Sequence, residues 1–221
     1  IERADTYCRL LEVSHAMTRE SGDVGSGART VWEPLVEITG DLDHFLAIHH
    51  VADEARVVRF LAFADENPNS VRSCLSRARQ NGQAVRDLLP TEVWEALNTV
   101  HLELSSGSPL RFSREGIFVF SREVRRAVAL LHGLVDSSMR RDGSWYFLRL
   151  GRFVERAEKT ARLLEVKYRL LLPDDPALVA GAQLHQWRTL LRSAGAHEAS
   201  LRLDIAPDAT RELVHLLVSD E

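Results

Sequence analysis

Residues 151–166 read GRFVERAEKTARLLEV, and most of this stretch occurs a second time at the start of the chain, where residues 1–13 read IERADTYCRLLEV. Moving the first segment along the chain by 153 positions lays residues 2–13 on residues 155–166. Eight of these twelve positions are identical, and a ninth exchanges aspartate for glutamate. Internal similarity of this kind predicts a duplicated helical architecture.

A weaker similarity continues beyond this segment at an offset of 155 positions. It predicts a first unit at residues 1–153 and the beginning of a second unit at 154–221, packed together as one helical domain. Both ends of the chain then fall inside a unit, so we expect the parent protein to extend in both directions. The positions that match at this offset are Trp32, Leu35, Gly40, Asp53, Arg56, Leu61, Asp65 and Glu66, which fall on Trp187, Leu190, Gly195, Asp208, Arg211, Leu216, Asp220 and Glu221.

The composition is that of an ordinary globular protein, with 221 residues, 45% hydrophobic and 27% charged. The net charge of −4 lacks the basic excess that nucleic-acid-binding domains usually show. The chain has no uninterrupted apolar run long enough for a transmembrane helix, and its two cysteines form no metal or redox motif. These observations predict a cytoplasmic protein without a nucleic-acid or membrane partner.

Apolar residues recur at intervals of three or four along most of the chain, which is the periodicity of an α-helix. We find no alternating strand pattern, so we expect an all-α fold, an antiparallel helical bundle without a sheet. Ser70 and Ser144 are expected to cap the helices that follow them. The expected helices cover residues 1–20, 30–39, 41–51, 53–64, 70–89, a segment from Pro90 to about residue 104, 113–140, 145–171, 178–194 and 208–219.

The repeated Glu-Arg-Ala-acid motif occurs together with residues 63–70, which read FADENPNS, and residues 142–152, which read DGSWYFLRLGR. This combination resembles the bacterial alpha-E domain family. Residues 132–136 also fit its pattern. The resemblance covers essentially the whole chain, and the stretch from Trp145 to Glu158 is its most specific part.

The resemblance implies an all-helical domain of unknown function. Such domains are typically encoded beside, or fused to, a circularly permuted ATP-grasp ligase and often near a transglutaminase-like protein. The implied role is that of an accessory or binding module in ATP-dependent formation of peptide or amide bonds. The alternative is an enzyme that uses the paired helical motifs for amide transfer or hydrolysis, with or without a metal.

The repeated motif places acids and arginines at helical spacing, and this spacing has two interpretations. Acid–base pairs four residues apart commonly lie on a solvated helix face, where each contributes only about 0.2–0.5 kcal/mol. Alternatively, the charged helix faces of the two repeats, each a stripe of acids and arginines, meet and form a polar site. Such a site would bind a cation, an amine or a peptide terminus. The candidate residues are Glu2, Arg3, Asp5, Arg9, Glu155, Arg156, Glu158 and Arg162.

A metal site has weaker support. Glu12 and His15, like Glu212 and His215, have the Glu-x-x-His spacing of di-iron helical bundles, but neither histidine is repeated in the other unit. His132 stands in an apolar helical pattern and is expected to be a core histidine with its hydrogen bonds made. We therefore expect no metal and no cofactor.

Overall fold

The computed structural model describes residues 1–20, 27–106, 116–171 and 190–196. Within these residues every regular element is helical, as the sequence predicts. The elements are α1 (Glu2–Glu20), α2 (Gly27–Thr39), α3 (Leu42–Ile48), α4 (Glu54–Val58), the π-helical turn η1 (Arg59–Phe63), α5 (Val71–Ala84), the 3₁₀ turn η2 (Arg86–Leu88), α6 (Thr91–Ser106), α7 (Gly116–Ser138) and α8 (Gly143–Leu171), and residues 190–194 are also helical.

The helix ends follow local chemistry. The Ser70 hydroxyl accepts a hydrogen bond from the backbone N–H of Ser73 at 3.1 Å, which confirms it as the cap of α5. At α8 the capping group is the side chain of Asp142, which accepts from the N–H of Ser144 at 3.0 Å, so the predicted Ser144 cap is wrong. The helices expected at residues 178–189 and 208–219 lie outside the described residues.

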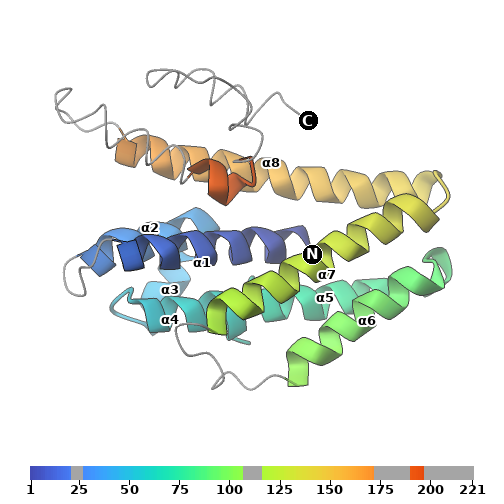
Figure 1. The fold of residues 1–221 in the computed structure, drawn as a ribbon, viewed down its shortest axis with the longest axis horizontal. Coiled ribbons are helices and arrows are strands. Elements are labelled where there is room, and N and C mark those ends of the chain that lie inside the picture. The colour runs from blue at the N-terminus through green and yellow to red at the C-terminus, as the bar shows by residue number, and fades with distance from the viewer. Residues whose placement is uncertain (21–26, 107–115, 172–189, 197–221) are drawn as a thin grey trace.

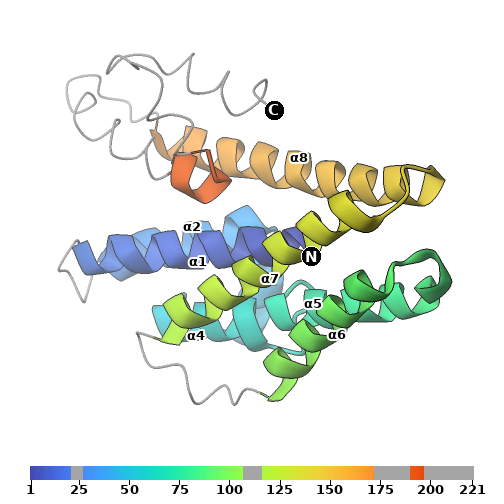
Figure 2. The ribbon, with the colours of Figure 1, turned by 45° about the vertical axis from the view of Figure 1, so that its right-hand side comes forward.

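Helix α1 lies in the middle of the fold, between α8 on one side and the α5–α6 hairpin on the other, while α7 crosses it (Figures 1 and 2). Consecutive helices joined by short loops, such as α5 and α6, run antiparallel as expected. Helices α1 and α8, however, run in the same direction. The antiparallel expectation is wrong for this pair because the two helices are not joined by a short loop, so no turn forces them to reverse.

The main hydrophobic core surrounds α1. Ala4, Cys8 and Leu11 are fully buried on one face of this helix, and Trp32 of α2 and Phe60 of η1 are fully buried in the same cluster. Burial of such apolar surface is the main stabilising contribution to folding. A smaller second core between α6, α7 and the start of α8 contains Val93, Leu97, Leu131, Val135, Met139 and Trp145.

No helix in the part of the chain that the structure describes is both long and apolar enough to cross a membrane.

Candidate functional site

Helix α8 turns its charged stripe toward α1. Lys159, Leu163 and Val166 are buried, whereas Ala157 and Ala161 are exposed. Glu155 therefore lies in the interface between the two helices, with 22% of its side chain exposed. The structure places Glu155 and Arg156 against α1, whereas the side chains of Glu158 and Arg162 are 40% and 46% exposed, so the solvated-face interpretation describes that pair.

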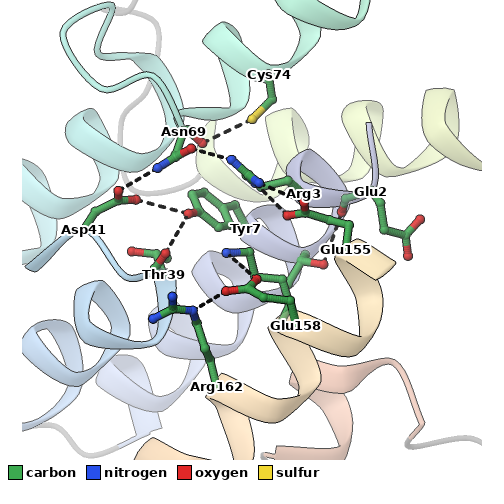
Figure 3. A network of polar contacts seen from close by, with 12 residues as sticks. Glu2, Arg3, Tyr7, Thr39, Asp41, Asn69, Cys74, Glu155, Glu158 and Arg162 are labelled. Carbon is green, nitrogen blue, oxygen red and sulfur yellow. Dashed lines mark hydrogen bonds and ion pairs between the residues drawn. The ribbon is translucent and has the colours of Figure 1, made fainter. Parts of the chain in front are cut away.

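The two Glu-Arg dipeptides exchange partners across this seam between α1 and α8 (Figure 3). Arg3 donates two hydrogen bonds to Glu155, from Nε to Oε1 at 2.6 Å and from Nη2 to Oε2 at 2.8 Å. In return, Arg156 donates from Nε to Oε1 of Glu2 at 2.8 Å. The arginine of each segment thus neutralises the glutamate of the other. A bidentate arginine–carboxylate pair fixes orientation as well as adding energy.

The other candidate residues pair within their own helices. Arg9 donates to Asp5 at 2.7 Å, and Arg162 donates to Glu158, as the spacing of four residues predicts. The buried ammonium group of Lys159 lies 2.9 Å from the Glu158 carboxylate. All eight candidate residues are therefore engaged in ion pairs, four of them across the α1–α8 seam and four within their own helices.

The charges of the seam change the acidity of its carboxyl groups. The hydrogen bonds from Arg3 hold the pKa of Glu155 below its ordinary value, because they stabilise the ionised form. For Glu158, burial acts to raise the pKa, but the hydrogen bonds with Lys159 and Arg162 outweigh it and the pKa is lowered. Both carboxyl groups are therefore acceptors and not proton donors at neutral pH.

Sequence analysis missed a set of residues that continues this network (Figure 3). Arg3 also donates from Nη1 to the side-chain oxygen of Asn69. The amide of Asn69 donates to Asp41 at 2.7 Å, and the hydroxyl of Tyr7 donates to the other oxygen of Asp41 at 3.1 Å. Burial, and then the nearby Asp41 carboxylate, raise the pKa of Tyr7 far above its ordinary value. The signal in the sequence was the segment that contains Asn69, which helped to identify the family resemblance.

Glu2 is the most deeply buried acid of the seam, with 7% of its side chain exposed. Its second oxygen, Oε2, lies 3.5 Å from Nε2 of His132 and 3.6 Å from Nε of Arg152. Nε2 of His132 is buried and makes no hydrogen bond with any described residue, so the expectation of a histidine with its hydrogen bonds made is wrong. Burial, and then the charge of Arg152, lower the pKa of His132.

Two glycines with left-handed backbone conformations flank the seam. Gly40 has φ = 82° and Gly195 has φ = 79°. A Cβ at Gly40 would lie 3.0 Å from Nη1 of Arg162, and a Cβ at Gly195 would lie 2.7 Å from Nη1 of Arg9. Glycine is the residue that ends a helix in this conformation without a steric penalty. Because these glycines have no side chain, Arg162 can pack against Gly40 and Arg9 against Gly195. In each case the arginine belongs to the other repeat.

The seam encloses little free space. Among the described residues, a small hollow of about 30 Å³ lies between its side chains. The residues that line it come from both segments and include Asp5, Arg9, Arg156, Lys159 and Ser193.

The Glu-x-x-His candidates do not form a metal site in the described residues. His15 is buried and its Nδ1 lies 2.6 Å from a carboxylate oxygen of Glu54, so Glu54 and not Glu12 is its partner. No group of three or more metal-binding side chains occurs within residues 1–20, 27–106, 116–171 and 190–196. Glu212 and His215 lie outside these ranges.

The fold and its seam define an all-helical domain that carries the Glu-Arg dipeptide twice, with the four side chains paired across two parallel helices. A family model described as a predicted alpha-helical domain with a conserved ER motif, named Alpha-E, matches residues 1–221. The chain therefore belongs to the Alpha-E family. No curated protein and no solved structure shows significant similarity to it.

Proposed function

We propose that this domain is an accessory binding module of an ATP-grasp-linked system that forms peptide or amide bonds. The family resemblance supports the association with the ligase, and with a transglutaminase-like protein. The observation that supports a binding role over a catalytic one is the pairing of Glu2 with Arg156 and of Glu155 with Arg3.

An enzyme that used these acids would need them available to substrate. A general acid or base must come within hydrogen-bond distance of the proton that it transfers. Here each carboxylate of the motif already accepts a hydrogen bond from an arginine, and Glu158 also lies beside Lys159. These ion pairs hold α1 and α8 in a defined register. A binding module needs such a fixed arrangement, because its recognition surface must keep its shape.

The test is co-expression of the chain with a circularly permuted ATP-grasp ligase, followed by size-exclusion chromatography and an assay of amide-bond formation. We expect the two proteins to co-elute, and we expect the chain alone to turn over neither ATP nor an amide substrate. Separate elution at micromolar concentrations of both proteins contradicts the module proposal. Turnover by the isolated chain that is lost in Glu155→Gln supports the enzyme alternative.

We also infer that the two motif segments descend from a duplication, with units at residues 1–153 and 154–221. Two observations support this inference. Sequence-equivalent residues exchange partners in the crossed Glu-Arg pairs, and the equivalent glycines, Gly40 and Gly195, both have positive φ beside the opposite segment's arginine. An experimentally determined structure tests it, because the rotation that lays α1 on α8 should also lay α2 on the helix that ends at Gly195. If superposing α2 on the helix that ends at Gly195 requires a different rotation from the one that superposes α1 on α8, the duplication is contradicted.

A further inference from the structure

The outward side of α8 carries a row of exposed apolar side chains. Tyr146 is 59% exposed, Phe147 76%, Leu150 56% and Val154 59%, and Ala157 and Ala161 are also exposed. At 100° per residue these six side chains fall within one sector of about 100°, which is the width of the stripe that an amphipathic helix normally buries. We call these six residues the outer α8 face.

The part of this face that has an equivalent on α1 is covered there by another helix. Ala157 and Ala161 correspond to Ala4 and Cys8, which are both fully buried. Among the described helices, α7 makes the most extensive contact with α1. The thiol of Cys8 faces the hydroxyl of Ser121 on α7, so α7 lies directly over this face.

Helix α7 covers α1 with a regular pattern. Phe120, Val124 and Val128 are buried in the same core cluster as Ala4 and Cys8. The small side chains of α1 allow the two helices to approach closely, because the distance between packed helices depends on the side chains at the contact. On α8 the corresponding residues are alanines, so that face is shaped for the same approach.

The edges of the two faces also carry matching charges. Arg125 of α7 donates to Glu12 at 2.7 Å and lies 3.7 Å from Asp5. The corresponding positions of α8 are Glu165 and Glu158, both acidic, and they lie beside the outer α8 face. Glu158 already pairs with Arg162, as Asp5 pairs with Arg9, and Arg125 adds a second contact to Asp5 on α1. An arginine at the same place on an approaching helix would lie beside Glu158 and Glu165.

We propose that the outer α8 face is the docking site for an amphipathic partner helix of the α7 type. This helix has apolar residues spaced as at Phe120, Val124 and Val128 and a basic residue next to them, facing Glu158 and Glu165. Complementary charge supports this occupant, and the correspondence of Ala157 and Ala161 with Ala4 and Cys8 supports its apolar spacing at that part of the face. The proposal does not depend on the ligase.

A fluorescent synthetic peptide of residues 116–138, the sequence of α7, is the probe. We expect it to bind the full chain saturably at 1:1 stoichiometry with micromolar affinity, and to become helical on binding. Leu150→Ser should weaken binding at least fivefold. Leu130→Ser is the matched control, because Leu130 is 55% exposed on α7, against 56% for Leu150 on α8. This control should leave the affinity unchanged.

Two further arms complete the test. A peptide with Arg125→Glu should bind at least fivefold more weakly, because its charge then opposes Glu158 and Glu165. Circular dichroism of each protein variant establishes that it remains folded. Peptide affinity equal in Leu150→Ser and wild type overturns the proposal. A second outcome also overturns it. If sedimentation shows that the wild-type chain is a dimer and that Leu150→Ser is a monomer, the occupant of the face is a second copy of the chain.

Discussion

Replacing Arg3 with methionine is expected to lower the free energy of unfolding by about 2 kcal/mol, less than for a fully buried ion pair because both side chains are partly exposed. The substitution removes both hydrogen bonds to Glu155 and leaves that carboxylate, which is 22% exposed, without its main counter-charge. Methionine keeps most of the apolar stem, so the loss reports on the charge. Urea denaturation followed by circular dichroism measures it.

The control for this loss is Arg56→Met. Arg56 pairs with Asp53 at the surface, where their side chains are 51% and 38% exposed, so we expect a change below about 1 kcal/mol. A double-mutant cycle between Arg3→Met and Glu155→Gln should give a coupling energy of about 1–2 kcal/mol. Equal losses in Arg3→Met and Arg56→Met would show that the crossed pair does not hold the seam.

The effect of Arg3→Met should also depend on pH. The pKa of Glu155 is lower in the folded than in the unfolded protein, where it is about 4.3. The stability that this pair contributes is therefore fully present above the unfolded pKa and is lost as the pH falls through the folded pKa. The difference between wild type and Arg3→Met should shrink between pH 5 and pH 3, and a difference that stays constant over this range argues against ionic pairing.

The second large effect is expected for Asn67→Ala, which should cost about 3 kcal/mol. Asn67 is fully buried, its amide donates to the carbonyl of Phe60 at 3.1 Å, and its oxygen accepts from the N–H of Asn69 at 2.8 Å. Alanine leaves both backbone groups without these partners, and each buried unsatisfied group costs about 1–3 kcal/mol. It also releases the turn that directs the side chain of Asn69 toward Arg3.

Asn98→Ala is the matched control for this substitution. Asn98 is half-buried and accepts one hydrogen bond, from Nε of the flexible Arg79 side chain at 2.7 Å. Its loss should cost about 1 kcal/mol, because water can reach the released guanidinium. Thermal unfolding of both variants provides the comparison, and a smaller loss at position 67 than at position 98 would show that the Asn67 turn is not a structural support of the seam.

The helices and the pairs within them could be predicted because their determinants are local. The spacing of Asp5 and Arg9, and of Glu158 and Arg162, places each acid one turn before its arginine, and the structure contains both pairs. The π-helical turn at residues 59–63 was missed and was included in a single helix, because its periodicity over five residues does not differ visibly from that of an α-helix.

The role of Tyr7 could not be predicted from its position in the motif. Its hydroxyl reaches Asp41, and Asp41 reaches Asn69, through contacts that link residues 34 and 28 positions apart. Such contacts depend on how α1, the start of α3 and the residue 67–70 turn pack together. The repeat gives no signal here, because Thr160 stands at the corresponding position of the second segment.

The sequence by itself determined that the chain is helical and that it presents the same Glu-Arg segment twice. Tertiary structure decided which side of α8 faces inward. This helix has one apolar side with Leu163 and Val166 and another with Val154 and Ala157, and its periodicity does not choose between them. The choice depends on contact with α1, about 150 residues earlier in the chain, where Arg3 and Glu155 satisfy each other's charge. The sequence of α8 alone does not determine this pairing, because the stabilising free energy arises only when Arg3 of α1 and Glu155 of α8 are in contact.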